Sequence, residues 1–421
     1  MLNINDDIKI GVIGLGYVGL PLACLFANKY HTVGYDINKQ KVADLQQGNN
    51  TEDPSVNEQL GLALQGKLTI TTDSSKLKSC NLYVVAVPTP VNKDNEPNIG
   101  YLLNATRSVG ALLSKGNVVV YESTVYPGLT EDVCAPLLET TSKLKLNKDF
   151  YVGFSPERIN PSDPLHTVEN IRKVTSGSTL EAAEFIDQIY NSVLKNGTFK
   201  AKSIRIAEAC KIMENCQRDV LIAFFNEFRM VFNNMGIDVN DVSQAASTKW
   251  NFIEAKPGLV GGHCIAVDPY YMISKSQQVG IVPQLLQTAR KINEGMAHWL
   301  ADNVEQWFTE RNLRKVQGRI LILGFSFKPD CSDIRNTKVA DLYNDLNRRG
   351  FHASVYDPLV NTDEVMEKYG IHVCSDPSPL NGKYQAVVIG THHTAFSKLN
   401  FDKLIEKNGF VCDINGLVKG K

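Results

Sequence analysis

Three glycines near the start of this chain restrict its possible folds more than any other feature. They occupy the pattern Gly14-Leu15-Gly16-Tyr17-Val18-Gly19 and follow the apolar, largely β-branched run Ile8–Ile13. A helix-like segment, Leu20–Asn28, comes next, and a second strand-like segment, His31–Tyr35, ends at Asp36. Strand, tight turn, helix and strand in this order predict a βαβ unit that opens a parallel sheet.

Each glycine has a separate task in such a unit. Gly14 permits the tight turn, Gly16 lets the backbone approach a pyrophosphate, and Gly19 allows the helix to pack closely on the strand. The helix N-terminus then offers amide donors and a partial positive charge to phosphates. The pattern therefore predicts dinucleotide contacts at this turn, made by Gly14, Gly16, Tyr17, Val18 and Gly19.

Asp36 indicates which dinucleotide is preferred. Its carboxylate, at the end of the second strand, can accept hydrogen bonds from a ribose 2′-hydroxyl and would repel a 2′-phosphate, which favours NAD over NADP. Two later segments, Val87–Pro90 and Glu122–Val125, follow the strand-like runs Leu82–Val87 and Val118–Tyr121. Ligands bind beyond such strand ends, although each segment alone is more typical of an ordinary turn. The further predicted cofactor contacts are Pro88, Thr89, Ser123 and Thr124.

Composition excludes several classes of protein. The 421 residues suffice for two or three domains, and 44 Lys and Arg against 45 Asp and Glu give no field that would favour nucleic acid or an anionic membrane. The apolar run Ile8–Leu25 has glycines at the fingerprint spacing and no cleavage site after it, so we do not interpret it as a signal or membrane segment. Nine dispersed cysteines without a Cys-x-x-Cys pair indicate a reducing cytoplasm and argue against a metal site or disulfides.

The rest of the chain divides into a helical middle and a second α/β region. Long amphipathic helices are predicted at about Lys202–Asn234 and Val282–Arg311. A second strand and helix pattern follows, with strands at Arg319–Leu323, Ala353–Tyr356 and Ala386–Ile389 and a helix around Lys338–Arg349. We therefore expect an α/β protein in which two Rossmann-like, doubly wound parallel-sheet domains, 1–200 and 313–421, are joined by a central helical dimerisation domain, 201–312.

Cys264 is the candidate nucleophile. It closes the breaker-rich loop Lys256–Cys264 behind Gly261 and Gly262, and Asp268 lies one helical turn further on. A lone cysteine is more often an inert, buried apolar residue, which is our interpretation of Cys24, Cys80, Cys134 and Cys374. His263 could pair with the thiolate, but adjacent loop residues seldom face each other, so we favour a structural or substrate-shaping role for it.

Lys211 and Asn215 lie one turn apart on the first long helix, so both project from one face. An ammonium and an amide together can hold an oxyanion or an ordered water. From spacing alone, a solvated helix face is the favoured interpretation. The segment Phe154-Ser155-Pro156-Glu157-Arg158 adds a carboxylate where a strand passes into a loop.

Taken together, these residues resemble the UDP-glucose/GDP-mannose dehydrogenase family over essentially the whole chain. Within that family the run from Gly258 to Tyr271, with His263 where UDP-glucose enzymes typically carry Ser or Thr, looks like the UDP-N-acetylhexosamine 6-dehydrogenases. So do Tyr121–Gly128 and Ser155–Pro161. The other motifs that carry the resemblance are Gly14–Gly19 with Asp36, Val87–Pro90, Lys211 with Asn215, and Phe327-Lys328 with Asp333-x-Arg335.

The resemblance implies a four-electron oxidation of a sugar C6 alcohol to a carboxylate with two NAD. It assigns Cys264 as the nucleophile that traps the aldehyde as a thiohemiacetal, which is then oxidised to a thioester and hydrolysed. Lys211 and Asn215 would stabilise the oxyanions, and Asp268 and Glu157 would assist proton transfer through water. Thr124 matches a position that contacts the nicotinamide and water.

The resemblance also implies the substrate contacts. Phe327 can flank uracil, Lys328 can meet phosphate, and Arg335 matches a position that reaches the NAD diphosphate. Where the UDP-glucose branch has an Arg before the cysteine loop, this chain has Thr248-Lys249-Trp250-Asn251, and Asp413–Gly416 stands where many relatives have another Arg. Lys249 or Lys256 could substitute. The expected substrate contacts are Glu157, Arg158, Lys211, Asn215, Lys256, Gly258, Gly261, His263, Phe327 and Lys328.

The predicted function is the oxidation of UDP-GlcNAc or UDP-GalNAc to the uronic acid, for a surface polysaccharide, by a homodimer paired through the central helices. UDP-ManNAc is an alternative substrate, because GlcNAc, GalNAc and ManNAc are epimers that no sequence pattern resolves. UDP-glucose is the other alternative. One alternative function is that of a two-electron dehydrogenase of the 6-phosphogluconate or 3-hydroxyacyl-CoA kind, which needs neither a loop thiol nor a second α/β domain. The other alternative is a protein that binds NAD and a nucleotide sugar without catalysis. Cys264 argues against it, because such a protein has no use for a nucleophile.

Overall fold

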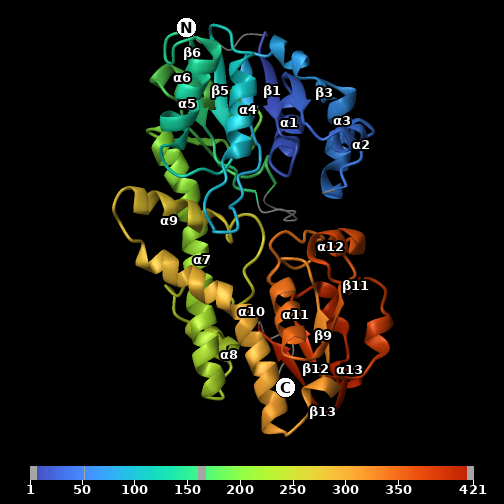
Figure 1. Ribbon diagram of the computed structural model, residues 1–421. Helices are drawn as coiled ribbons and strands as arrows, with labels where there is room; N and C mark the ends of the chain where they lie inside the picture. Colours follow the sequence, from blue (N-terminus) through green and yellow to red (C-terminus); the bar gives the residue numbers. More distant parts are fainter. Residues whose placement is uncertain (1–6, 52, 160–166, 415–421) are drawn as a thin grey trace. The chain divides into compact units, whose positions relative to one another are not determined.

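The computed structural model describes residues 7–51, 53–159 and 167–414. They form two compact units, Met1–Glu214 with Tyr270–Val279 and Asn215–Pro269 with Gly280–Lys421, each containing one large parallel sheet (Figure 1). Because the boundaries between these units fall inside α7 (Ile204–Asn234) and α9 (Asp268–Gln278), both helices contribute residues to both units.

The first unit contains a six-stranded parallel sheet in the order β3-β2-β1-β4-β5-β6. The order reverses between β1 and β4, and this reversal is where doubly wound sheets bind ligands beyond the carboxyl ends of their strands. The strands are β1 (Lys9–Ile13), β2 (His31–Tyr35), β3 (Leu68–Thr71), β4 (Leu82–Val85), β5 (Asn117–Tyr121) and β6 (Phe150–Phe154).

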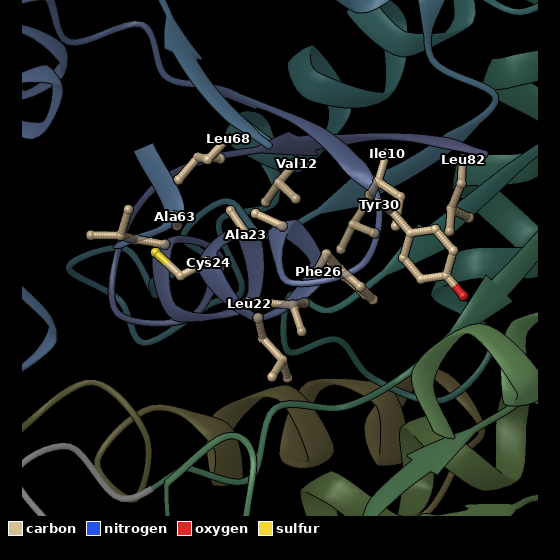
Figure 2. Packing of buried hydrophobic residues seen from close by; sticks show 14 of the residues in the cluster. Ile10, Val12, Leu22, Ala23, Cys24, Phe26, Tyr30, Ala63, Leu68 and Leu82 are labelled. Carbon is tan, nitrogen blue, oxygen red and sulfur yellow. The ribbon is translucent and has the colours of Figure 1, made fainter. Parts of the chain in front are cut away.

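Helices cover both faces of this sheet, because its strands are apolar on both sides. On one face, α1 contributes Leu22 and Phe26, and β1 contributes Ile10 and Val12, to one buried apolar cluster (Figure 2). On the other face, α4 and α5 contribute apolar side chains to a second cluster. The helices are α1 (Gly19–Ala27), α2 (Lys39–Gln46), α3 (Asn57–Gln65), α4 (Gly100–Gly110), α5 (Ala135–Ser142) and α6 (Leu180–Asn191), and β7 (Lys173–Thr175) pairs with β8 (Thr198–Lys200).

The second unit contains a five-stranded parallel sheet in the order β11-β10-β9-β12-β13, which repeats the first five positions of the other sheet. Its strands are β9 (Arg319–Leu323), β10 (His352–Tyr356), β11 (Val373–Cys374), β12 (Tyr384–Ile389) and β13 (Ile405–Asp413). α10 (Gln284–Glu310) and α11 (Lys338–Arg348) pack on one face. The unit also contains α8 (Val239–Ala246), α12 (Thr362–Tyr369) and α13 (Phe401–Leu404).

The expected fold class is confirmed, since two parallel α/β sheets flank long helices along the chain. The strands predicted at His31–Tyr35 and Arg319–Leu323 agree with β2 and β9 residue for residue. The strand predicted to reach Val87 ends at Val85, which leaves Val87 in the loop. The apolar run Ile8–Leu25 is β1, the glycine turn and most of α1, as predicted. Among the described residues, no helix is both long and apolar enough to cross a membrane.

Candidate active site

The glycine turn between β1 and α1 has the geometry expected of a dinucleotide-binding loop. Gly14 has φ +92°, and a Cβ there would lie 2.7 Å from the Ala86 carbonyl oxygen. A Cβ on Gly19 would lie 1.8 Å from the Gly14 oxygen, so only glycine lets the helix approach. No atom lies within 4 Å of a Cβ built on Gly16. Two glycines are therefore required by the fold itself, and the space beside the third is open to a ligand.

Asp36 is held at the same turn by backbone amides. Its Oδ2 accepts a hydrogen bond from Leu15 N at 2.9 Å, and its Oδ1 accepts one from Asn38 N at 2.9 Å. A carboxylate oxygen has more than one acceptor position, so the group can still accept ribose hydroxyls. The turn and Asp36 thus fit an NAD molecule.

The loops after β4 and β5 meet at the edge of the sheet where the strand order reverses. Ser123 Oγ donates a hydrogen bond to the Val87 carbonyl at 2.7 Å, and Tyr271 OH donates one to the Pro90 carbonyl at 3.2 Å. The predicted contacts Pro88, Thr89 and Thr124 belong to these two loops. The topology therefore brings the predicted cofactor residues of the first unit to one sheet edge.

Lys211 and Glu157 form a buried pair in the first unit. Lys211 Nζ donates to the Glu157 carbonyl oxygen at 2.7 Å. The Glu157 side chain turns back on its own loop, where its Oε1 accepts hydrogen bonds from Arg158 N and Ile159 N, both at 2.6 Å. Lys211 is 7% exposed and Asn215 is 6% exposed, so the interpretation of this helix face as solvated is wrong.

A charge network that the sequence analysis missed lies beneath Glu157. Lys173 Nζ, fully buried at the start of β7, lies 2.7 Å from Glu122 Oε2 and 3.5 Å from Glu157 Oε2. It also donates to the Pro156 carbonyl at 3.2 Å, and Tyr190 OH donates to Glu122 Oε1 at 2.6 Å. Burial alone would lower the pKa of Lys173, but the two carboxylates raise it. No local pattern marks Lys173, because its partners are distant in the sequence.

Burial, together with the charge of Glu157, raises the pKa of Glu122 from 4.5 to about 7, although Lys173 acts in the opposite direction. Between pH 4.5 and about pH 7, Glu122 is protonated in the folded state and ionised in the unfolded chain. The contribution of Glu122 to stability therefore falls as the pH rises through this range. We expect Glu122→Gln to remove this loss, which is on the order of 3 kcal/mol. Urea unfolding of both proteins at pH 5 and pH 8 measures it, and equal pH dependence in the two would contradict the prediction.

In the second unit, Cys264 lies in a turn directly before α9. Its carbonyl accepts hydrogen bonds from Val267 N at 3.0 Å and Asp268 N at 2.8 Å, and its Sγ lies 3.1 Å from His263 Nδ1. The expectation that these neighbours would not face each other is wrong. The left-handed backbone at Gly262, φ +82°, turns the chain, and the His263 ring packs against Phe327 with centroids 6.1 Å apart. The imidazole can therefore take the thiol proton.

Asn215 and Asp268 form the second polar pair of this unit. Asn215 Nδ2 donates to Asp268 Oδ2, and Asp268 is 2% exposed. This bond orients the amide of Asn215. Asn215 thus has a buried carboxylate partner, and Lys211, one turn earlier on α7, has a carbonyl partner.

The loop after β9 carries Phe327 and Lys328. Burial lowers the pKa of Lys328, and the negative charge of the Cys264 thiolate is among the interactions that oppose this, which places the ammonium within electrostatic reach of the sulfur. His393 supports the loop from below, since Asp330 N donates to its Nδ1 at 2.9 Å and its Nε2 lies 2.9 Å from Asp357. The glycines 261 and 262 admit this chain's own Asn336 and Phe327, which a Cβ would meet at 2.7 Å.

The remaining predicted residues have varied surroundings. Arg335 forms an ion pair with Asp333 at 2.5 Å, and Arg158 forms one with Glu214 at 2.6 Å. Lys249 and Lys256 are exposed. Four residues of the quoted motifs lie outside the described part of the chain, namely Asn160, Pro161, Asn415 and Gly416. Within the described part, no group of three or more His, Cys, Asp or Glu side chains could hold a metal ion.

All nine cysteines are free thiols. Cys24, Cys80 and Cys134 are buried, as predicted, and burial raises their pKa. The same prediction is wrong for Cys374, which is only half-buried because it lies on the short edge strand β11. Cys264 is also half-buried, and it is the thiol placed beside an imidazole.

Comparison with known proteins agrees with this geometry. Three models of the UDP-glucose/GDP-mannose dehydrogenase family match: its NAD binding domain at residues 8–194, its central domain at 205–295 and its UDP binding domain at 321–420. Fold, site and matches together define an NAD-dependent oxidoreductase of the nucleotide-sugar dehydrogenase class. The chain belongs to the UDP-glucose/GDP-mannose dehydrogenase family. The alternative of a 6-phosphogluconate or 3-hydroxyacyl-CoA type dehydrogenase is thereby excluded.

Two relatives carry one name. The UDP-N-acetyl-D-glucosamine 6-dehydrogenase of Pseudomonas aeruginosa is 43% identical, over 94% of this chain and 93% of its own length. The enzyme of the same name from Salmonella typhi is 42% identical, over 95% and 93%. Among solved structures, the UDP-D-ManNAc dehydrogenase of Pyrococcus horikoshii matches with a TM-score of 0.88 and 30% identity, covering 98% of this chain and 97% of that one.

Proposed function

We propose that this protein oxidises the C6 alcohol of UDP-GlcNAc to the uronic acid, in four electrons. The observation that carries the choice of sugar is the 43% identity, over nearly the full length of both chains, to an enzyme named for that substrate. Dehydrogenases named for UDP-ManNAc are also similar, at 32% identity or less in sequence, which makes UDP-ManNAc the second candidate. The Cys264 and His263 pair supports acid formation rather than arrest at the aldehyde.

When bound, NAD accepts a hydride from C6 in each of the two oxidations. Between them, the Cys264 sulfur adds to the aldehyde carbon, a C–S bond forms, and the carbonyl oxygen takes a proton to give a thiohemiacetal. Loss of hydride and of that proton leaves a thioester. Water then adds to the thioester carbon, the C–S bond breaks, and the acid and the thiol are released. His263, at 3.1 Å from Sγ, takes and returns the thiol proton.

We assign the remaining polar residues to the charges that form at C6. The Lys211 ammonium and the Asn215 amide stabilise the oxyanions, since each has a buried partner that orients it. Asp268 and Glu157 assist proton transfer through water, and Thr124 contacts the nicotinamide and the same water. Phe327 flanks the uracil, and Lys328 meets phosphate. We assign sugar contacts to Arg158, Lys256, Gly258 and Gly261, and a contact with the NAD diphosphate to Arg335.

We further propose a preference for NAD over NADP, supported by the position of Asp36. Asp36→Asn should raise the KM for NAD about tenfold, because a charged acceptor for the ribose hydroxyls is lost, and should improve the use of NADP. The measurement is kcat/KM for both cofactors. Asp44→Asn is the control and should leave both values unchanged, because Asp44 lies on α2 and accepts a hydrogen bond from Gln40 at 3.0 Å. An unaltered NAD to NADP ratio in Asp36→Asn would contradict the assignment.

A homodimer is proposed through α7 and the chain that follows it. Phe224, Phe228 and Val231 lie at helical spacing and form one exposed apolar stripe on α7, which the exposed Met235 continues directly after the helix, and Trp250 is 92% exposed. A continuous apolar stripe of this kind is typical of a surface that a second copy covers. Sedimentation analysis of the wild type should give a dimer and that of Phe228→Glu a monomer, whereas a monomeric wild type would contradict the proposal.

We also propose the division into domains 1–200, 201–312 and 313–421 for these roles, since each of the three family matches lies within one of these ranges. The requirement for a free thiol at Cys264 supports a reducing cytoplasm as the place of action. We propose that the uronic acid product serves a surface polysaccharide.

The decisive experiment is the amount of NADH formed per sugar at limiting UDP-GlcNAc, UDP-GalNAc, UDP-ManNAc or UDP-glucose with excess NAD. We expect a ratio of about two with UDP-GlcNAc, because one trapped intermediate passes two hydrides. A ratio of two only with another sugar would change the substrate. A ratio of one would refute the four-electron reaction, and no NADH with any sugar would favour a protein that binds without catalysis.

A further inference from the structure

We propose that Asn226 and Arg290 are positioning residues for the nucleophile, because they hold the two ends of the Cys264 loop, Gly258–Ile265, from buried positions on α7 and α10. The inference rests on the proposed function for the role of the thiol. It concerns residues that no local pattern marks and that the four-electron scheme does not use. All of them lie in the second unit.

The start of the loop is held by Asn226. Its side chain is fully buried, its Oδ1 accepts a hydrogen bond from Gly258 N at 2.8 Å, and its Nδ2 donates to the Gly258 carbonyl at 3.1 Å. An amide side chain that binds both backbone groups of one residue replaces the partners that a strand or helix would supply. Gly258 is therefore fixed in position and orientation by one side chain.

The end of the loop is held by Arg290, which is 2% exposed. Its Nη1 donates to the Ile265 carbonyl at 3.2 Å and to Asp219 Oδ1 at 3.0 Å, and its Nη2 donates to Glu294 at 2.7 Å. Ile265 directly follows Cys264. Burial raises the pKa of Asp219 to about 6, and the charge of Arg290 opposes this.

Asn293 of α10 joins the two anchors. Its Oδ1 accepts a hydrogen bond from Asn226 at 2.8 Å, and its Nδ2 donates to Asp219 Oδ1 at 2.7 Å. An unbroken chain of contacts thus runs from Gly258 through the two helices to Ile265. Ionised groups and amides are costly to bury without partners, and here hydrogen bonds connect these groups to both ends of the loop.

The loop needs such anchors because it has little structure of its own. Residues 252–261 have no helix or strand. Its middle is tied to the loop after β9, where Gly262 N donates to the Arg335 carbonyl at 3.0 Å and Asn336 Nδ2 donates to the Gly262 carbonyl at 3.0 Å. With both ends held as well, His263 and Cys264 can keep the 3.1 Å contact that favours thiolate.

A control exists at an exposed position on the same two helices. Asn233 of α7 donates to Asn303 of α10 at 3.0 Å, which repeats the Asn226 to Asn293 bond two helical turns later without the loop. If Asn226 served only to join α7 and α10, then Asn226→Ala would lower the free energy of unfolding, by more than Asn233→Ala because Asn226 is buried, and both variants would leave the chemistry of Cys264 unchanged. If it positions the thiol, only Asn226→Ala should affect the chemistry of Cys264.

The first measurement is the rate of Cys264 alkylation by iodoacetamide between pH 6 and 9, followed by mass spectrometry of the Cys264 peptide without any substrate. We expect Cys264 of Asn226→Ala to be alkylated at least roughly threefold more slowly at pH 7 than that of Asn233→Ala, and the midpoint of its pH profile to move upward. The reason is that a loop without its anchor no longer holds the Cys264 sulfur against the His263 imidazole. His263 and Lys328 are ionisable groups near the sulfur, and Asp333 Oδ2 lies 3.9 Å from the Nε2 atom of the same imidazole. Superimposable profiles for the two variants would overturn the proposal.

The second measurement is NADH formed per limiting UDP-GlcNAc in the presence of hydroxylamine, which traps free aldehyde. Asn226→Ala should fall from about two towards one and release trapped aldehyde, with the KM of the first oxidation unchanged, whereas Asn233→Ala should stay at two. If the wild type oxidises no sugar, the proposed function fails and alkylation alone decides this inference. If Asn226→Ala does not fold, Asn226→Asp takes its place in both measurements, because it keeps the bond from Gly258 N and loses the bonds that Nδ2 donates to the Gly258 carbonyl and to Asn293 Oδ1.

Discussion

Replacing Cys264 with Ser is expected to abolish uronic acid formation while the first oxidation persists. A serine hydroxyl beside His263 is a much weaker nucleophile towards an aldehyde than a thiolate. Acid formation should fall on the order of 10³-fold or more. The measurement is acid and NADH formed per UDP-GlcNAc, which should approach zero acid and at most one NADH.

Cys374→Ser is the matched control for this substitution. Cys374 is a half-buried thiol on β11, and it has no assigned role. Its replacement should leave about two NADH per sugar, because the intermediate is held on another sulfur. Unchanged acid production by Cys264→Ser would show that the thiol does not carry the intermediate, and equal losses in both variants would point to a general effect of removing a cysteine.

Lys173→Met is expected to have the largest effect on stability. The ammonium is fully buried between Glu122 and Glu157, at 2.7 and 3.5 Å, and Met has a similar length but no charge. When the ammonium is removed, the two buried carboxylates lose the cation that lies beside both of them. Removal of one partner from a buried ion pair typically costs about 3–5 kcal/mol, and we expect a loss of this size in the free energy of unfolding.

Lys200→Met provides the comparison on the neighbouring strand. Lys200 of β8 pairs with Glu184, but these side chains are 44% and 51% exposed, so its loss should cost less than about 1 kcal/mol. Urea unfolding at pH 8, where Glu122 is ionised in the wild type, gives both values. The double variant Lys173→Met with Glu122→Gln should regain part of the loss, because one buried charge is removed. A loss below 1 kcal/mol in Lys173→Met would contradict the importance of the network.

The sequence alone determined the fold class and selected the candidate site residues. Glycine conformation and hydrophobic periodicity act over a few neighbouring residues, so β2, β9 and the long helices could be predicted almost to the residue. The open space at Gly16 and the steric demands at Gly14 and Gly19 also follow from a local pattern. Cys264, Lys211 and Asn215 stood out by residue type and by the order of their motifs.

Only the tertiary structure decided the surroundings of those residues. Whether Lys211 faced solvent, and whether His263 faced Cys264, depended on what the fold placed against them. Lys173 meets Glu122 across 51 positions, and Asn226 meets Gly258 across 32. Such contacts leave no periodic trace in the chain, because an isolated Lys or Asn has the same local sequence whether its distant partner is present or absent. The physical reason is range: backbone propensity is local, whereas burial and hydrogen bonding are set by neighbours that folding alone brings together.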